Sequence, residues 1–233
     1  SAASDVYKRQ DYYKSHLNEL LNIRQGGIAI YGAVIGGFLT LLVFCKIRKQ
    51  NFFLISDIAV LGLLVGQIMG RWGNFTNREV FGHYTDSLFA MRLPIEAVRS
   101  ADITSDIAAH ITDGINYIQV HPTFLYESVL NLLLLIVLLL YMKHKKFNGE
   151  IALGYLGGYG IIRFFVEGIR TDQLKIGSTG IAVSQLLGMV LFIAAILTDV
   201  IVRIYRRKKG LQELPQKAAV VQNKVENDEK QDE

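Results

Sequence analysis

The sequence predicts an all-α polytopic membrane protein with about five transmembrane helices and a small folded cap on its outer face. Five apolar runs approach the roughly 20 residues that a helix needs to cross a bilayer. Hydrophobic residues make up 51% of the chain and the mean hydropathy is +0.28, values that are high for a soluble protein. Clusters of basic residues directly follow several of these runs, as is typical of membrane proteins. The length of 233 residues suits one domain.

The apolar runs divide the chain into alternating segments. They cover approximately residues 28–45, 52–69, 124–142, 151–166 and 181–202. Basic residues follow the first, third and fifth runs: Lys46, Arg48 and Lys49; Lys143, Lys145 and Lys146; Arg203, Arg206, Arg207, Lys208 and Lys209. The positive-inside rule places all three clusters in the cytoplasm and leaves residues 1–27, 71–123 and 167–180 outside. The net charge of +4 therefore indicates a membrane surface rather than nucleic acid.

The two ends of the chain differ from the apolar region, residues 28–205, that we expect to form the transmembrane catalytic domain. Within 1–27, apolar residues at helical spacing in 11–24 predict an amphipathic helix at the membrane surface. The first ten residues contain no methionine and no signal-peptide pattern, so we expect a truncated or foreign end there. Residues 206–233 are rich in Gln, Lys, Glu and Asp, which predicts a disordered cytoplasmic tail.

The outer segment between the second and third runs is too polar to enter the bilayer. We expect residues 83–120 to form a small folded cap. Residues 87–93 and 115–120 have strand character, and 101–111 is predicted to be a short helix that begins after Ser100. The single cysteine, Cys45, excludes an internal disulfide and is interpreted as a packing residue.

A first polar motif, Gly70 to Gly82, closes the second apolar run. It brings an arginine, two asparagines and a glutamate to the point where hydrocarbon gives way to water. Charge at membrane depth is costly and is tolerated mainly where it faces a partner or a polar cavity. Arg71 and Asn74 share a face if the helix continues, and a guanidinium with amide neighbours suits a phosphate. Alternatively, the arginine only extends to the interface. We expect the glycines to expose backbone N–H groups to a ligand: Gly70, Gly73 and Gly82.

A second motif, residues 121–127, precedes and opens the third run. Proline is tolerated in the first turn of a helix, and Thr123 is expected to help cap it. Glu127 then falls about one turn inside the membrane, where a carboxylate needs a partner whether its role is structural or catalytic. His121 is interpreted mainly as a structural residue at the helix start.

A third motif closes the fourth run. Tyr159, Arg163, Glu167 and Arg170 are spaced by four, four and three residues, so they share one helical face. Arg163 and Glu167 could be an ordinary i,i+4 ion pair, yet such a pair at the membrane edge favours a function. Ser184 and Gln185 are interpreted as packing or capping residues. Glycines in the fourth run and around Tyr31 predict close helix packing: Gly154, Gly157, Gly158 and Gly160, and several between Gly26 and Gly37.

The three motifs together resemble one family. G-R-x-x-N-F-x-N-x-E-x-x-G at 70–82 resembles the signature of the prolipoprotein diacylglyceryl transferases. Residues 121–127 resemble their H-P-x-x-L-Y-E motif, and residues 159–170 resemble their Y-x-x-x-R-F-x-x-E-x-x-R pattern. The resemblance covers about residues 11–205. It implies a fold of seven helices, of which this chain would contain the last five.

The resemblance implies a reaction at the outer face of a bacterial plasma membrane. The diacylglyceryl group of phosphatidylglycerol would move to the lipobox cysteine thiol of a prolipoprotein signal peptide, forming a thioether and releasing glycerol phosphate. Membrane lipids and the prolipoprotein are the implied partners, and neither nucleic acid, metal nor nucleotide cofactor is required.

The family also implies residue roles. Arg71 and Arg163 would hold the leaving phosphate, helped by a hydrogen bond from Asn74. Glu79, Glu127 and Glu167 would orient the arginines or accept the thiol proton, with His121 as a minor candidate base. Tyr31 stands where many members have histidine, and we expect it to bind an oxygen of the substrate. The implied substrate-binding residues are Arg71, Asn74, Asn77, Gly82, Tyr126, Glu127, Tyr159, Arg163 and Arg170.

Two other functions are alternatives for such a membrane protein. A channel or transporter for an anionic solute would need polar residues through the cytoplasmic half of its helices. That half is largely apolar here, for example between Leu132 and Leu140, which favours a site open only to the outside and to lipid. A structural scaffold would leave the clustered arginines unexplained.

Overall fold

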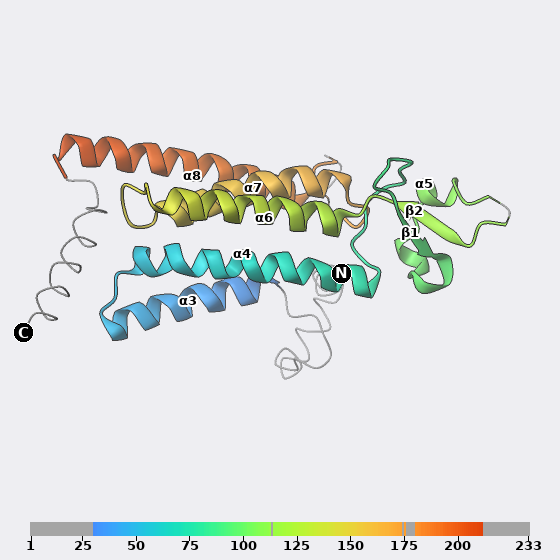
Figure 1. The fold of residues 1–233 in the computed structure, drawn as a ribbon, viewed down its shortest axis with the longest axis horizontal. Helices are drawn as coiled ribbons and strands as arrows, with labels where there is room; N and C mark the ends of the chain where they lie inside the picture. Colours follow the sequence, from blue (N-terminus) through green and yellow to red (C-terminus); the bar gives the residue numbers. More distant parts are fainter. Residues whose placement is uncertain (1–29, 113, 174, 176–179, 212–233) are drawn as a thin grey trace, which may run out of the picture.

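The computed structural model describes residues 30–112, 114–173, 175 and 180–211. Its main body is a bundle of long helices lying side by side, and a small cap stands at one end (Figure 1). The long helices are α3 (Ile30–Arg48), α4 (Phe52–Asn77), α6 (Thr123–Met142), α7 (Glu150–Ile169) and α8 (Val183–Lys208). Each coincides with one of the five predicted apolar runs, so the predicted fold class is confirmed.

Two of these helices, α4 and α8, extend more than five residues beyond their predicted ends. The second run was expected to end at residue 69, but α4 continues to Asn77. Arg78 stops it by adopting the left-handed conformation, with φ 54° and ψ 44°, and its N–H points to the carbonyls of Asn74 and Phe75. At the other end of the chain α8 continues to Lys208, so residues 206–208 are helical rather than part of a tail. The predicted amphipathic helix and residues 212–233 lie outside the described residues.

The surface of the bundle is apolar, as a membrane protein requires. About five transmembrane helices were predicted; among the described residues, three of them, α4, α6 and α8, are long and apolar enough to span a bilayer. Large apolar side chains on the bundle exterior are more than half exposed, including Val34, Phe38, Leu133, Val137 and Ile201. So much exposed apolar surface would be a liability in water and indicates contact with lipid.

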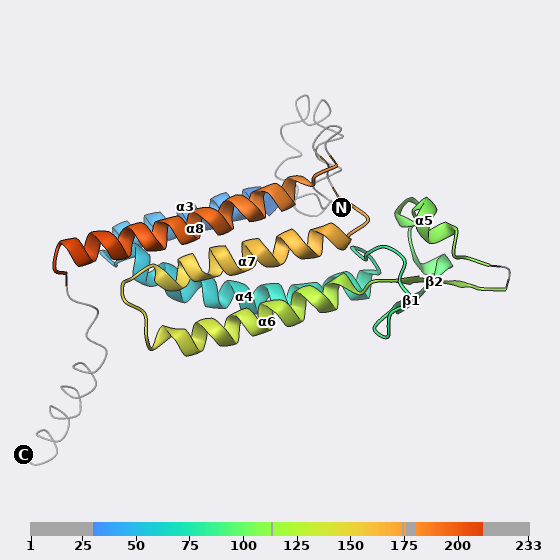
Figure 2. The ribbon, with the colours of Figure 1, turned by 90° about the horizontal axis from the view of Figure 1, so that it is seen from above.

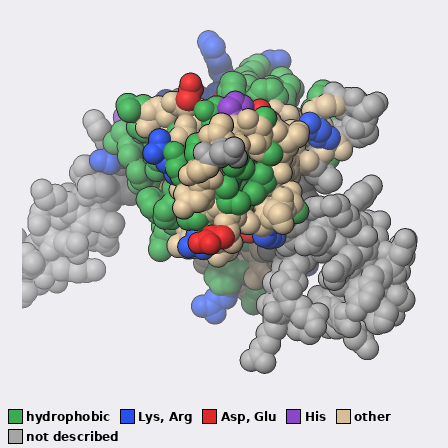
Figure 3. Space-filling view, turned by 90° about the vertical axis from the view of Figure 1, so that its right-hand side faces the viewer, with side chains coloured by type: hydrophobic (Ala, Val, Ile, Leu, Met, Phe, Trp, Pro, Cys, Tyr) green, Lys and Arg blue, Asp and Glu red, His purple; other side chains and the backbone are tan. Residues whose placement is uncertain are grey.

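The three basic clusters lie at the same end of the bundle. The α3–α4 connection, the α6–α7 connection and the end of α8 are together at one end, and the cap lies at the opposite end (Figures 1 and 2). The predicted alternating topology requires this arrangement. Seen from the cap end, acidic and basic side chains are scattered among apolar and uncharged ones (Figure 3).

Glycines let α7 approach its neighbours closely, as predicted. A Cβ atom on Gly160 would lie 2.5 Å from the carbonyl oxygen of Gly188 in α8. Gly158 and Gly154 likewise leave room for leucine side chains of α6. The same prediction is wrong for the glycines of α3 that the structure describes, since no heavy atom lies within 4 Å of a Cβ atom added at Gly32, Gly36 or Gly37. Gln185 caps α8 by accepting from the Ala182 N–H at 3.3 Å, and it donates to the Phe164 carbonyl of α7 at 3.2 Å.

A buried carboxylate fixes the start of α7 at the end of the bundle opposite the cap. Asp57 of α4 accepts hydrogen bonds from Lys145 Nζ at 3.0 Å and from the N–H groups of Gly149 and Ala152 at 2.9 and 3.0 Å. Negative charge is favourable at a helix N-terminus, so these bonds hold α7 in register with α4. The third motif, carried by α7, is positioned through this contact.

The cap is built on a two-stranded antiparallel sheet of β1 (Met91–Pro94) and β2 (Tyr117–Val120). Between the strands lie η3 (Ile95–Ala97), η4 (Ser100–Asp102) and α5 (Ser105–Ala108). The two predicted strands are therefore present, whereas the predicted helix over 101–111 is divided into two short pieces. Thr104 accounts for the break, because it caps α5 through the Ile107 N–H. The buried core of the cap consists of Phe81, Leu93, Val98, Ile107, Ile118 and Val120.

Candidate active site

The three polar motifs meet at the cap end of the bundle, around Glu127. Its Oε1 atom lies 2.6 Å from Arg71 Nη2, and its Oε2 atom lies 3.2 Å from Arg163 Nη1. The Glu127 side chain is 2% exposed, and the two arginines are 18% and 16% exposed. A buried carboxylate is costly unless it is paired, and here two guanidinium groups from different helices pair with it.

The start of α6 places Glu127 at this depth. Pro122 is the N-cap and offers no side-chain cap, and the Thr123 hydroxyl donates to the carbonyl of Val80. The expected capping role of Thr123 is therefore wrong. Its hydroxyl ties the first turn of α6 to the segment that follows α4, and so it fixes the second motif against the first.

Tyr159, Arg163 and Glu167 of the third motif lie along one face of α7, as their spacing predicts. Arg170 follows the end of the helix in an extended conformation, so its predicted place on that face is wrong. Tyr159 Oη donates to Glu127 at 3.3 Å, and Arg163 Nη2 lies 2.6 Å from Glu167. Arg170 lies 3.6 Å from Glu167 and 2.7 Å from Asp172. Arg163 does form the ordinary i,i+4 pair that we considered, but it also reaches Glu127 on α6. The pair is thus one part of a network that joins α4, α6 and α7.

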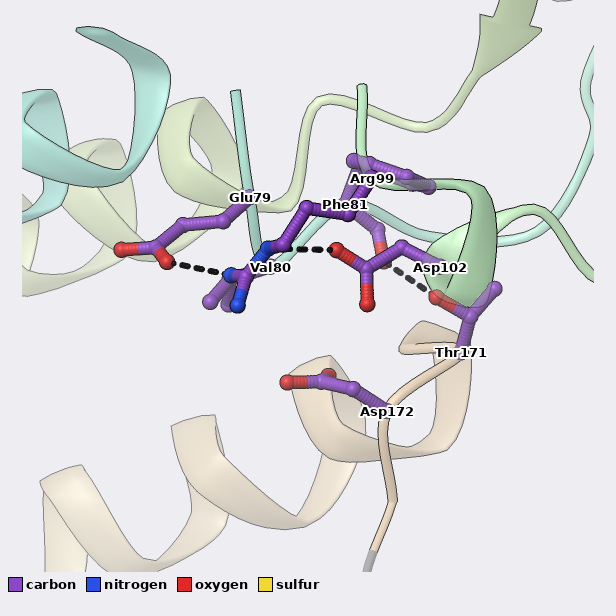
Figure 4. A pocket seen from close by; sticks show the side chains of 7 residues that line it. All are labelled: Glu79, Val80, Phe81, Arg99, Asp102, Thr171 and Asp172. Atoms are coloured by element: carbon purple, nitrogen blue, oxygen red, sulfur yellow. Dashed lines mark hydrogen bonds and ion pairs between the residues drawn. The ribbon is translucent and has the colours of Figure 1, made fainter. Parts of the chain in front are cut away.

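The first motif continues this network towards the cap. Arg71 Nη1 donates to Asn74 Oδ1 at 3.3 Å, so the two residues share a face as predicted. Asn74 and Asn77 donate to Glu79 at 3.3 and 3.2 Å. Glu79 pairs at 2.9 Å with Arg99 of the cap (Figure 4). Arg71 thus contacts the carboxylate of Glu127 directly, and it is connected to Glu79 only through Asn74.

A small pocket lies where the bundle meets the cap. Its lining brings the carboxylates of Glu79, Asp102 and Asp172 together with Arg99 (Figure 4). Burial would raise the pKa of Asp172, but the hydrogen bonds and charge of Arg170 hold that pKa below its usual value. The Asp172 carboxylate therefore stays ionised and keeps Arg170 in place.

Gly82 is closely packed by other segments of the chain. A Cβ atom there would lie 2.7 Å from His121 Cβ and 2.9 Å from the Ile169 carbonyl oxygen. The Gly82 N–H donates to the His121 carbonyl at 3.0 Å. Gly70 and Gly73 lie inside α4, where N–H groups belong to the helix. The expectation of bare backbone at these three glycines is wrong, because α4 is longer than predicted and Gly82 is enclosed.

His121 lies at the start of α6, and one of its ring nitrogens is 3.2 Å from the Tyr126 hydroxyl. Partial burial lowers the pKa of His121 and the charge of His83 lowers it further, which favours a neutral imidazole. Tyr126 is therefore placed beside a candidate base, one turn from Pro122 and next to Glu127 in the chain.

Comparison with known proteins identifies the family of the chain. A family model described as prolipoprotein diacylglyceryl transferase matches residues 5–201. The chain belongs to the prolipoprotein diacylglyceryl transferase family. The resemblance seen in the three motifs is thereby confirmed.

Three curated relatives, each named phosphatidylglycerol–prolipoprotein diacylglyceryl transferase, illustrate the similarity. The protein from Lactobacillus acidophilus is 44% identical over 200 residues, which cover 84% of this chain and 66% of the relative. That from Finegoldia magna is 40% identical over 191 residues, covering 82% and 67%. A Listeria monocytogenes relative is 42% identical over 199 residues, covering 85% and 66%. The chain thus spans about two thirds of the length of these relatives.

Tyr31 is the second residue of α3. Its side chain lies outside the described part of the structure, so its role stays a prediction.

A set of polar residues one turn deeper in the bundle was not predicted from the three motifs. Gln67 precedes Arg71 by four residues, Tyr155 precedes Tyr159 by four, and Asn131 follows Glu127 by four. Gln67 Nε2 donates to the Tyr155 hydroxyl at 2.9 Å. Asn131 is fully buried, and neither of its side-chain polar atoms has a partner among the described residues. The i,i+4 spacing from motif residues is the signal that could have revealed this set.

Proposed function

We propose that this chain carries the site at which the diacylglyceryl group of phosphatidylglycerol is transferred to a prolipoprotein cysteine. The observation that carries the proposal is that Arg71 and Arg163, from different helices, meet on the single buried carboxylate of Glu127. Relatives bearing the name of this activity support it. The whole reaction belongs to the whole protein, of which this chain matches about two thirds.

Both arginines are arranged to stabilise a leaving phosphate. Arg71 uses one terminal nitrogen for Glu127 and the other for Asn74, and Arg163 divides its terminal nitrogens between Glu127 and Glu167. A guanidinium has five N–H donors, so each arginine keeps donors for a second oxygen ligand. Fixed cations that already face the developing charge lower the barrier without reorganising during the reaction.

The proposed bond changes are a displacement at carbon. The cysteine sulfur, as a thiolate, attacks the carbon of the diacylated glycerol that bears the phosphate. A C–S bond forms, the C–O bond breaks, and the phosphate oxygen takes the electron pair as glycerol phosphate leaves. The thiol, with a pKa near 8.5 when free, must first lose its proton. His121 and the carboxylates of Glu79, Glu127 and Glu167 are the candidate acceptors.

The bundle surface supports a substrate that stays in the membrane. Trp72 and Phe75, beside Arg71 in α4, are about half exposed, and Val129 and Leu130 expose apolar surface on α6. Lipid tails could remain in the bilayer while the phosphate reaches the arginines. The signal peptide of a prolipoprotein, with its lipobox cysteine, would approach the same end.

We place this end on the outer face of a bacterial plasma membrane and the C-terminus in the cytoplasm. The three basic clusters at the other end support that orientation through the positive-inside rule. The bacterial sources of the relatives support the membrane assignment.

An anion transporter is less well supported by the same structure. Towards the basic end, the bundle interior is closed by an apolar cluster that contains Leu64, Leu138 and Ile151. A solute path through the bundle would have to cross this cluster, whereas a transferase needs access from the cap end and the lipid only.

The experiment that tests the proposal measures transfer of labelled diacylglyceryl from phosphatidylglycerol vesicles to a peptide with a lipobox cysteine. The chain is assayed as it stands and also extended to the length of its relatives. Arg71→Ala and Arg163→Ala should each abolish most of the transfer, while Arg92→Ala, on the exposed face of the cap, should not. Transfer at the parent rate by both site variants would refute the proposal.

A further inference from the structure

The loop between α4 and β1 presents two adjacent apolar side chains to its surroundings. Leu88 is 94% exposed and Phe89 is 66% exposed. Leu88 is the most exposed large apolar side chain in the described part of the cap and bundle. Two neighbouring side chains of this size are seldom left in water without a partner.

The structure holds this loop in a defined shape. Tyr84 forms a bridge with Val120, and Met91 is also paired with Val120, so residues 85–90 leave and return at one point of β2. Within the loop, the Thr85 hydroxyl accepts from the Ser87 N–H at 3.2 Å, and the Ala90 N–H donates to the Ser87 carbonyl at 2.9 Å. The resulting tight turn directs Leu88 and Phe89 outward.

The loop is attached close to the first residue of α6, at the cap end of the bundle. Val120 precedes the first residue of α6, Thr123, by only three positions. At the same level, the Phe124 ring lies 5.4 Å from Trp72 and 4.8 Å from Phe75. Trp72 is about half exposed, and tryptophan side chains at helix ends are typical of the membrane–water interface. Figures 1 and 2 show the segment between α4 and β1 beside this end of the bundle, turning away from its axis.

We propose that Leu88 and Phe89 insert into the lipid on the cap side of the membrane and anchor the cap to the bilayer. The occupant of this surface is the bilayer itself, because the loop begins and ends beside Val120, three residues before α6, whose first turn packs against the half-exposed Trp72 of α4. Insertion of apolar side chains to about 5–10 Å, at the boundary of headgroups and acyl chains, removes them from water. The inference does not depend on the transferase activity.

The anchor would act on the candidate site through β2. Val120 leads directly into His121 and the start of α6, which carries Glu127. A cap held against the membrane at Leu88 and Phe89 therefore keeps the first turn of α6 in place.

The proposal is tested with an environment-sensitive dye at Leu88→Cys or Phe89→Cys. Cys45, the one native cysteine, is buried and does not compete for the label. The chain is reconstituted into phosphatidylcholine–phosphatidylglycerol vesicles that contain a lipid with a quencher just below its headgroup. We expect a blue-shifted emission that the quencher lowers by about half or more, the result of insertion to that depth. The matched control, Ser100→Cys on the exposed part of the cap, should show neither effect.

Two outcomes overturn the proposal. Quenching at position 88 that is no stronger than at the control position 100 shows that the loop does not insert. A blue shift at 88 without quenching by the lipid shows that another part of the chain or a partner protein covers the loop.

A second variant separates insertion from mere proximity. With the dye at Phe89→Cys, Leu88→Asp should reduce quenching to the level of Ser100→Cys, because a carboxylate opposes entry into lipid. Leu88 is almost fully exposed, so Leu88→Asp should leave the protein folded. An unchanged unfolding midpoint of this variant verifies that the loss of quenching is not caused by unfolding. Full quenching in the Leu88→Asp variant would show that the apolar side chain does not drive the contact, and would also overturn the proposal.

Discussion

Glu127 of α6 contacts Arg71 of α4 at 2.6 Å, and this contact joins two motifs that are far apart in the sequence. The same carboxylate contacts Arg163, and the network continues through Glu167, Arg170 and Asp172. Three guanidinium groups are therefore matched by three carboxylates. A bound phosphate would add negative charge next to Arg71 and Arg163, so the geometry of Glu127 decides how those donors face the substrate.

Glu127→Gln should lower transfer about ten- to a hundredfold, equivalent to roughly 1.5–3 kcal/mol. The amide retains the shape of the side chain but removes the charge that holds two guanidinium groups together. The measurement is the initial rate of diacylglyceryl transfer at equal protein levels in the membrane. Glu96→Gln, an exposed acid of the cap, is the matched control and should transfer at the parent rate. Parent-rate transfer by Glu127→Gln would show that the carboxylate is dispensable.

Arg71→Lys and Arg163→Lys should both impair transfer, although less than the alanine variants. Lysine keeps the positive charge but loses the planar fork that reaches two partners at once, as each arginine does here. A charged hydrogen bond lost from such a site costs about 1.5–3 kcal/mol. Arg92→Lys on the cap provides the control. An arginine that only extended to the interface would tolerate lysine fully, so unchanged rates would favour that simpler role.

Much of this site could be predicted from the sequence because helical spacing fixes which residues share a face. Tyr159, Arg163 and Glu167 were placed together by their spacing alone, and the apolar runs located the helices. The partner of Glu127 could not be predicted, since it depends on how α4 and α7 pack against α6. The extension of α4 to Asn77 also escaped prediction, because a left-handed arginine is an uncommon helix end. The close packing around Gly82 could not be predicted either, because its neighbours, His121 and Ile169, come from distant segments of the chain.

The orientation of the bundle can be tested with an impermeant thiol reagent on intact cells. Ser100→Cys should be labelled from outside, and His144→Cys should be labelled only after the membrane is opened. Position 144 is preferable to Gly149 in the same connection, because Gly149 is buried, has φ +99°, and would bring a Cβ atom to 3.1 Å from Phe53. Buried Cys45 in the parent chain should remain unlabelled. Labelling of both variants on intact cells would contradict the proposed topology.

Gly160→Ala should destabilise the bundle by about 1–3 kcal/mol, the usual cost of overpacking. The new methyl group would lie 2.5 Å from the Gly188 carbonyl oxygen, and backbone atoms cannot move aside as a flexible side chain can. The unfolding midpoint in detergent measures the effect. Gly66→Ala in α4, with no heavy atom within 4 Å of the added methyl group, should be neutral or slightly stabilising. Equal midpoints for the two variants would show that α7 and α8 do not pack as described.

Asn131→Leu should stabilise the protein, whereas Asn131→Asp should destabilise it. Asn131 is fully buried in α6, and neither its Nδ2 nor its Oδ1 atom is paired among the described residues. A buried polar group without a partner costs about 1–3 kcal/mol, and an apolar side chain of similar size removes that cost. An aspartate at the same position would bury a charge only one turn from Glu127, which adds repulsion to desolvation. Unfolding midpoints of the three proteins, measured in one detergent at neutral pH, should therefore rank leucine above asparagine above aspartate. A lower midpoint for leucine would mean that the asparagine amide is satisfied in the membrane and contributes to stability, contrary to this prediction.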